Sequence, residues 1–238
     1  MNTMQKDFVF VGDENPPVVG SPDGSVWRSK TTKTAGTPTV LTDNGFMVLS
    51  LDATLEDQVA VLYMGDELPF DLDNLLTLDI WAKLSTASLH AAISCAFGLI
   101  SAHNDDLDLV AAAAMFRCYG SNAVVCETDD GTNDNDDVAS GLNLATTVKR
   151  FTIDFASGIK AVVPPPSVGG KGNVLFSADD DRVNLRQVAR ATRFDMSNYN
   201  SGLQLFAQIQ KGAASSVIAA DVSASLSIQR YRVKWKTD

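Results

Sequence analysis

The stretch CETDDGTNDNDDV, residues 126–138, holds six acids among thirteen residues. Carboxylates at this density fit three interpretations. They can act as acid and nucleophile on a glycosidic bond, they can bind calcium, or they can be the solvent-exposed residues of a turn between two strands. The spacing of the acids decides between them.

Glu127 and Asp129 are separated by one residue, so on a strand their side chains share a face. Retaining glycosidases built on β-sandwiches use this spacing, and laminarinase-like hydrolases carry an E-x-D-x-E strand. Here the third position is Gly131, so the general acid that protonates the leaving group is missing. The sequence therefore predicts that the protein is not an enzyme, with a degenerate hydrolase-like sandwich as an alternative.

An EF-hand loop needs acids at alternate positions, a glycine at the sixth and a bidentate glutamate at the twelfth, and no register of DDGTNDNDDV supplies them. An irregular calcium site on Asp129, Asp134 and Asp136 remains an alternative, and no other cofactor is expected. Asp, Asn, Gly and Thr are also the residues of a solvated β-turn. The favoured interpretation is therefore a solvated loop that connects two strands.

Other reactive groups are sparse. There are only two histidines, His90 and His103, and no G-x-S-x-G or P-loop motif accompanies them. The three cysteines are too widely spaced for a zinc ribbon or a disulfide framework and are expected to be buried free thiols: Cys95, Cys118 and Cys126.

The formal net charge of −10 argues against a nucleic-acid binder, because phosphate contacts need clustered Lys and Arg. Residues 1–144 hold 22 acids and 6 bases, a net charge of −16, whereas residues 145–238 hold 7 acids and 13 bases, a net charge of +6. This asymmetry predicts an acidic face and a basic face, which favour head-to-tail association or docking on a charged partner. The longest apolar run, residues 109–116, is too short to span a bilayer, so no membrane contact is expected.

Alternating apolar and polar residues predict strands along most of the chain. Alternation is clear at 76–84, 150–155 and 203–210, and short apolar runs predict buried strands at 46–51, 59–63, 91–99 and 123–128. Further strands are expected at 109–116, 174–177 and 187–196, and a long closing strand that changes face in its middle is expected at 224–235. Many short strands without a strong helix are typical of an all-β fold, a β-sandwich or jelly roll.

Residues 1–45 are rich in Gly, Pro, Thr, Ser and Asp and predict an extended N-terminal arm with short strands, followed by one β-sandwich domain over 46–238. Phe8, Phe10 and Trp27 in the arm require burial, on the domain or on a neighbouring subunit. Four arginines recur every three or four residues near the C-terminal end. With the arm aromatics they are the predicted partner contacts: Arg182, Arg186, Arg190 and Arg193.

Four sequence segments resemble those of a known family: LSLDATLEDQVAVLYMGDELPFDLDNL, FRCYGSNAVVCETDDGTNDNDDV, RFTIDFASGI and RFDMSNYNSGLQLFAQIQKG. With the closing strand they cover roughly residues 45–235, and together they resemble the jelly-roll decoration or cement proteins of tailed-bacteriophage heads. The resemblance implies a non-enzymatic virion protein, synthesised in the host cytoplasm. It also implies a homotrimer that binds the major capsid protein on the outside of the head and stabilises contacts between its copies.

A carbohydrate-binding module on the same sandwich, for example in a phage fibre, is the alternative. Such a site needs exposed aromatic rings on which a sugar can stack. Each candidate ring fits a core or an interface at least as well: Trp27, Trp81, Tyr119, Tyr199 and Trp235.

Overall fold

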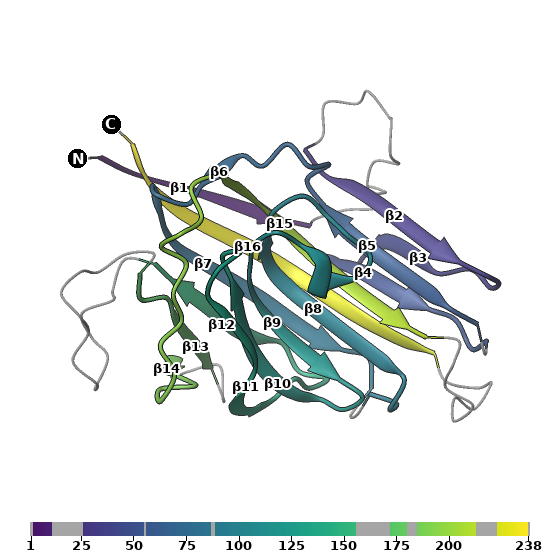
Figure 1. The fold of residues 1–238 in the computed structure, drawn as a ribbon. Coiled ribbons are helices and arrows are strands. Elements are labelled where there is room, and N and C mark those ends of the chain that lie inside the picture. Colours follow the sequence, from purple (N-terminus) through teal and green to yellow (C-terminus); the bar gives the residue numbers. More distant parts are fainter. Residues whose placement is uncertain are drawn as a thin grey trace.

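The computed structural model describes residues 2–10, 26–54, 56–86, 89–155, 172–179, 185–212 and 223–237. This part of the chain consists of strands, their connections and one short 3-10 helix, η1 (Leu107–Leu109) (Figure 1). The strands are β1 (Asn2–Val9), β2 (Arg28–Lys33), β3 (Thr39–Asp43), β4 (Phe46–Leu51), β5 (Gln58–Tyr63), β6 (Phe70–Asp71), β7 (Leu75–Leu84), β8 (Ile93–Ile100), β9 (Ala113–Tyr119), β10 (Ala123–Asp129), β11 (Asp134–Asn143), β12 (Lys149–Asp154), β13 (Leu175–Asp179), β14 (Leu185–Gln187), β15 (Gly202–Lys211) and β16 (Ala224–Thr237). Within the described ranges no helix is long and apolar enough to cross a membrane.

The strands form two antiparallel sheets that pack on each other as a sandwich (Figure 1). Sheet A has the order β14-β13-β12-β7-β16-β4-β3, with β1 paired to β16. Sheet B has the order β11-β10-β9-β8-β15-β5-β2, with β6 paired to β15. The predicted all-β sandwich of the jelly-roll kind is therefore confirmed.

The core lies between the two sheets because apolar residues recur at every second position of most strands. On β7, Leu78, Ile80 and Ala82 are buried in the core, whereas the residues between them face outward. The hydroxyl of the buried Tyr231 on β16 donates to the backbone oxygen of Phe206 on β15 at 2.7 Å and so joins sheet A to sheet B. The three cysteines are buried free thiols, as expected.

The N-terminal segment differs from the expected separate arm, because its strands belong to the sheets. β1 pairs with β16, β2 with β5 and β3 with β4. The rings of Phe8 and Phe10 lie 5.5 and 5.6 Å from the ring of Trp27, which in turn lies 5.6 Å from the ring of Tyr231. These aromatic side chains are buried in the chain's own core, so the domain itself supplies the burial that was expected on the domain or on a neighbouring subunit.

Three other segments differ from the expected strands. Residues 109–116 split into the end of η1, a short connection and the start of β9. In the 187–196 segment only Gln187 belongs to a strand, and the arginines around it lie on β14 and in a loop. The acids from Asp134 to Asp137 begin β11, so the acidic connection is only a tight turn over Asp130–Asn133. The closing strand is confirmed, with a register shift between Ile228 and Arg230 where the change of face was expected.

Candidate functional site on the outer face of sheet B

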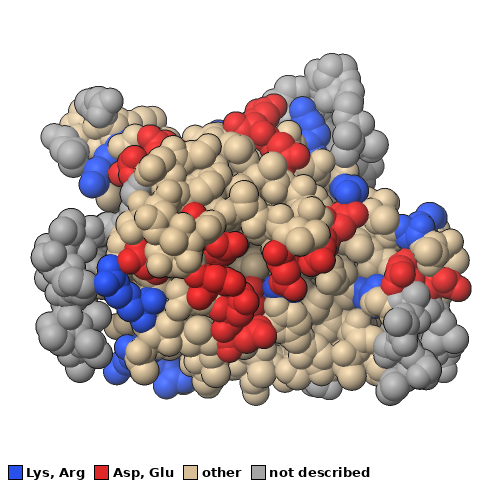
Figure 2. All heavy atoms as spheres, viewed as in Figure 1, with Lys and Arg blue, Asp and Glu red and all other residues tan. Residues whose placement is uncertain are grey.

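The connection between β8 and β9, residues 101–112, lies across the outer face of sheet B. Its Leu107 and Val110 pack on the buried outward side chains of four strands, which form a second apolar cluster: Val61 on β5, Phe206 on β15, Ile100 on β8, and Ala113 and Met115 on β9. We call this connection the cover loop. It shields the middle of the sheet from solvent and brings a row of acids onto that face (Figure 2).

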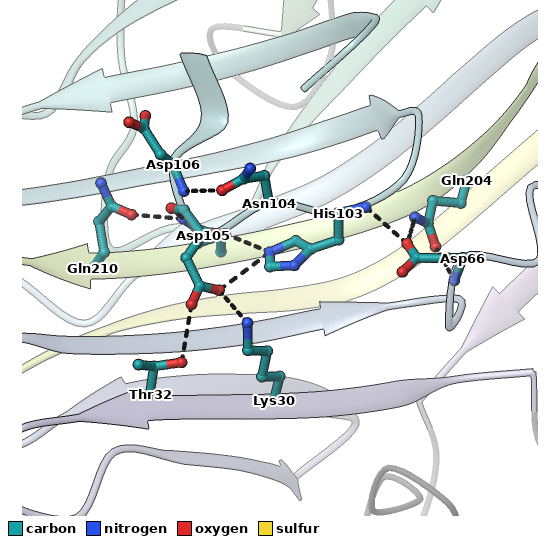
Figure 3. Close-up of polar contacts among 10 residues, drawn as sticks. Lys30, Thr32, Asp66, His103, Asn104, Asp105, Asp106, Gln204 and Gln210 are labelled. Carbon is teal, nitrogen blue, oxygen red and sulfur yellow. Dashed lines mark hydrogen bonds and ion pairs between the residues drawn. The ribbon is translucent and has the colours of Figure 1, made fainter. Parts of the chain in front are cut away.

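One end of the cover loop is held by His103 and Asp105 (Figure 3). The His103 ring lies 3.0 Å from Gln208 Oε1, measured from Nε2, and the His103 backbone N–H donates to Asp66 at 2.7 Å. Asp105 accepts hydrogen bonds from Lys30 Nζ at 2.8 Å and Thr32 Oγ1 at 3.1 Å. Burial lowers the pKa of His103, which favours the neutral ring. The His103 side chain is therefore buried and fixes the loop.

The other end of the cover loop is held by Arg117 on β9. Its Nη1 donates to Asp108 at 2.6 Å and to Glu127 on β10 at 3.2 Å. The second oxygen of Glu127 accepts the hydroxyl of Tyr119 at 3.0 Å, and the Arg117 guanidinium lies 4.1 Å from the centre of the Tyr119 ring. Arg117 and Glu127 are both buried, whereas Tyr119 is 39% exposed. We call these three residues and Asp108 the Glu127 cluster.

Burial raises the pKa of Glu127 to about 7, because the carboxylate has lost its water and Arg117 offsets that loss only in part. Burial also raises the pKa of Tyr119, and the neighbouring Glu127 charge adds to this shift. The cluster therefore contains a carboxyl group that exchanges its proton near neutral pH. A group of this kind can act as a general acid or base.

The E-x-D-x-E pattern of a glycosidase strand ends here after its second acid, Asp129. Asp129 is the last residue of β10, and Gly131 lies in the following turn with φ of +81°. Asp130 is buried there and accepts backbone hydrogen bonds from Thr132 at 3.0 Å and Asn133 at 2.6 Å. Two acids from other elements lie near Glu127: Asp108 of the cover loop shares the Arg117 guanidinium with it, and Asp137 of β11 contacts it.

The residues of the predicted calcium site lie close together. Asp129 and Asp134 face each other across β10 and β11. Burial raises the pKa of Asp134, and the nearby charges of Asp136 and Asp129 raise it further. In the described part of the chain no group of three or more His, Cys, Asp or Glu side chains is arranged to hold a metal ion. Calcium binding by these acids stays a prediction.

Three of the four arginines predicted to contact a partner lie in the described part of the chain. Arg182 lies outside the described residues. Arg186 and Arg190 are exposed beside a groove of about 760 Å³ between β14 and β11. Arg193 donates to the backbone oxygen of Gly172 at 3.0 Å and pairs with Asp195 at 2.7 Å. Partner binding by this segment also stays a prediction.

The aromatic residues proposed for sugar stacking fall into two groups. Trp27 is buried, and Tyr199 and Trp235 are partly buried against the core. Tyr119 on sheet B and Trp81 on sheet A face outward. The Trp81 ring has three guanidinium carbons within 5.5 Å of its centre, those of Arg150, Arg230 and Arg232. Tyr119 is therefore the aromatic with the most open ring.

No protein-family model matches the chain, and no curated protein is similar to it in sequence. Solved structures share its fold. One comes from work on endo-acting O-glycanases of the human gut microbiota that initiate mucin breakdown (TM-score 0.60, 10% identity, 97% of this chain and 99% of that one). Another is SCLam, a non-specific endo-β-1,3(4)-glucanase of family GH16 (TM-score 0.57, 14% identity, 100% and 94%). A third is the carbohydrate recognition domain of Emp47p (TM-score 0.51, 12% identity, 94% and 95%).

At such identities these likenesses show the jelly-roll fold alone. They nevertheless contradict the prediction that the protein is not an enzyme, because glycoside hydrolases are prominent among the structures that share the fold. That prediction depended on the missing third acid in β10, on the absence of other catalytic motifs and on the family resemblance. Asp108 and Asp137, from other elements, lie near Glu127.

Proposed function

We propose that the protein is a carbohydrate-binding β-sandwich that holds a sugar on the outer face of sheet B, beside Tyr119. The observation that supports this is the fixed, exposed ring of Tyr119. Its hydroxyl is held by Glu127 at 3.0 Å, and one side of the ring is covered by Arg117. A ring held in this way offers its open side to the apolar face of a sugar at little cost in side-chain entropy.

The polar neighbours of Tyr119 suit the hydroxyl groups of a sugar. Strand register places Ser94 opposite Tyr119, and Gln210 opposite Ser94, so the three residues form a row across β9, β8 and β15. Both polar residues are half-buried, and this row lies beside the part of the face that the cover loop shields. The exposed acids Asp106 and Asp108 border the row and supply further acceptors.

A glycan array followed by calorimetry tests this proposal. We expect Tyr119→Ala to weaken binding at least tenfold, because stacking on the ring is lost. Tyr119→Phe keeps the ring and should retain most of the affinity. Trp81→Ala, on the opposite face, is the matched control and should bind at least as tightly as the unchanged protein does. Loss of binding in Trp81→Ala alone would move the site to sheet A, and no binding to any glycan would overturn the proposal.

Hydrolysis of the bound glycan is the second candidate function. The observation that favours it is the pKa of Glu127, about 7, since a carboxyl group protonated near neutral pH can give its proton to a leaving group. Glu127 is buried beside Asp108, so the cover loop must shift before a glycosidic bond can reach it. Turnover of β-glucans or mucin O-glycans that Glu127→Gln abolishes, while binding persists, would establish this activity. If neither β-glucans nor mucin O-glycans are turned over, hydrolysis is rejected and carbohydrate binding remains the proposed function.

A place in the phage virion remains a proposal based on the sequence resemblance. A jelly-roll protein that binds only the assembled lattice would stabilise a capsid by mass action. Peptide mass spectrometry of purified phage heads tests it: the chain should be found at a fixed ratio to the major capsid protein. Its absence from washed particles would reject the capsid role without bearing on glycan binding.

A further inference from the structure

The outer face of sheet A carries a group of basic residues around Trp81. Five bases point outward from three neighbouring strands, against three acids: Lys83, Arg150, Arg230, Arg232 and Lys234, with Asp7, Asp79 and Asp154. The three guanidinium carbons lie 5.1 to 5.5 Å from the centre of the Trp81 ring. We call this surface the arginine face.

The guanidinium groups of the arginine face are only partly used inside the chain. Arg150 donates Nε and Nη2 to Asp79. Arg230 and Arg232 both pair with Asp7, at 2.7 and 2.8 Å, and these bonds hold the pKa of Asp7 at about 2 although burial opposes the shift. Each guanidinium carries five N–H donors, so several donors remain for an external acceptor. Tryptophan and arginine are also the residues that most often dominate a binding interface.

The outer face of sheet B has the opposite charge. Its exposed acids come from the cover loop and from β11: Asp106, Asp108, Asp134, Asp136 and Asp137. The bases that lie among them are already paired, Lys30 with Asp105 and Arg117 with Asp108 and Glu127. Figure 2 shows acidic side chains gathered across the middle of this face. One molecule thus presents both halves of a complementary interface on opposite sides of its sandwich.

We propose that the arginine face docks on the acidic outer face of sheet B of a second copy of this chain. Arg150, Arg230 and Arg232 would share their spare donors with the acids of the cover loop and β11, and Trp81 would be buried at the centre of the contact. Together with the flanking β13 and β4, the three strands of the arginine face make five strands about 4.8 Å apart and on average about eight residues long, which span roughly 600 Å² in projection. With the relief of the side chains this approaches the 800 Å² or so that each partner gives to a stable interface.

The position of the two faces sets the kind of assembly. The contact is head-to-tail, because different surfaces of the two copies meet. The surfaces lie on opposite sides of the sandwich, so each added copy continues in the same direction and the contact builds an open stack rather than a closed ring. Stacking also covers the Tyr119 surface proposed for glycan binding, but it does not depend on that function.

Light scattering after size exclusion tests the proposal. At low ionic strength the average mass should rise with protein concentration above the 25.4 kDa of one chain. It should return to the single-chain mass at about 1 M salt, where charges are screened beyond about 3 Å. Trp81→Ala should lower the apparent association constant at least tenfold. A mass that stays at one chain at low salt, or a fixed trimer at every concentration and salt, would overturn the proposal.

A mixing experiment separates this contact from general charge effects. Lys83→Glu/Lys234→Glu makes the arginine face acidic, and Asp106→Lys/Asp136→Lys removes most of the net negative charge of the acidic face. Each double variant alone should remain a single chain, while an equimolar mixture should associate, because each offers the face that the other needs. The control Lys6→Glu/Lys33→Glu changes the net charge by the same amount, but at positions outside both faces. It should stack like the unchanged protein. A mixture that does not associate, or a control that loses stacking, would reject face-to-face docking.

Discussion

The guanidinium of Arg117 and the carboxylate of Glu127 lie 3.2 Å apart with both side chains buried, and each of them depends on the other to compensate for lost water. The same guanidinium nitrogen lies 2.6 Å from Asp108, which is largely exposed. One arginine therefore links the buried charge of β10 to the solvent-exposed cover loop.

Replacing Arg117 with methionine should destabilise the protein by about 3–5 kcal/mol, because it leaves the Glu127 carboxylate buried without a positively charged partner. Chemical denaturation followed by tryptophan fluorescence measures this loss. The control is Asp108→Ala, which removes the exposed partner and should cost no more than about 1 kcal/mol. Equal losses in the two variants would show that the buried Arg117–Glu127 pair contributes no more to stability than the exposed contact of Arg117 with Asp108.

Stability should depend on the protonation of Glu127. Its pKa in the folded protein, about 7, lies above the ordinary 4.5, so the folded chain binds this proton more tightly than the unfolded chain. The tighter proton binding therefore adds about 3 kcal/mol to the free energy of unfolding below pH 4.5. This stabilisation is lost as the pH rises from 4.5 to 7.

Glu127→Gln isolates this effect, because glutamine is neutral at every pH. The difference in unfolding free energy between variant and unchanged protein should grow in favour of the variant between pH 4.5 and pH 7. Denaturant titrations at a series of pH values measure it. A difference that is constant with pH would show that Glu127 titrates normally.

Asp134→Asn should raise the melting temperature at neutral pH without added metal, because it relieves the repulsion among Asp134, Asp136 and Asp129. Calcium binding at these acids predicts the opposite sign in calcium buffer, where the variant would lose a ligand. Thermal melts with calcium and with EDTA therefore test both ideas. If the unchanged protein melts at the same temperature in calcium and in EDTA, these acids do not bind calcium.

Gly98→Ala should be strongly destabilising. Gly98 lies in β8 with φ of +156°, and an added Cβ would meet the backbone oxygen of Ala114 at 2.4 Å and Met115 Cα at 2.8 Å. We expect a cost of about 2 kcal/mol or more from this clash. Gly141→Ala is the control, because φ there is +72° but nothing lies within 4 Å of the added atom. Its cost should be only the backbone strain of about 1 kcal/mol.

The sequence predicts the fold well where strands have one buried face. β4 was expected with the bounds it has, and β7, β12 and β15 were expected within two residues, because alternation reports burial directly. β11 was missed because its first four residues are polar and the strand lies at the edge of sheet B, where few positions are buried. The N-terminal strands were assigned to an arm for the same reason, since β1 has one buried residue.

The candidate site was predicted only in part. Glu127 was recognised from its spacing to Asp129, but Arg117 was not singled out, although an arginine inside an apolar strand requires a buried partner. The turn after Tyr119 makes β9 and β10 a hairpin, and this pairing brings Arg117 beside Glu127. The cover loop could not be inferred, because its contacts with Lys30 and Gln208 join positions far apart in the chain.

The strand order also constrains how the chain can be synthesised. β15 and β16 are the last strands along the chain, yet β15 lies between β8 and β5, and β16 between β7 and β4. A nascent chain that has not released residues 202–237 from the ribosome therefore holds two incomplete sheets, each divided at its centre. Both sheets can therefore be completed only after residues 202–237 have left the ribosome, and a chain truncated before these strands would expose the inner faces of both sheets.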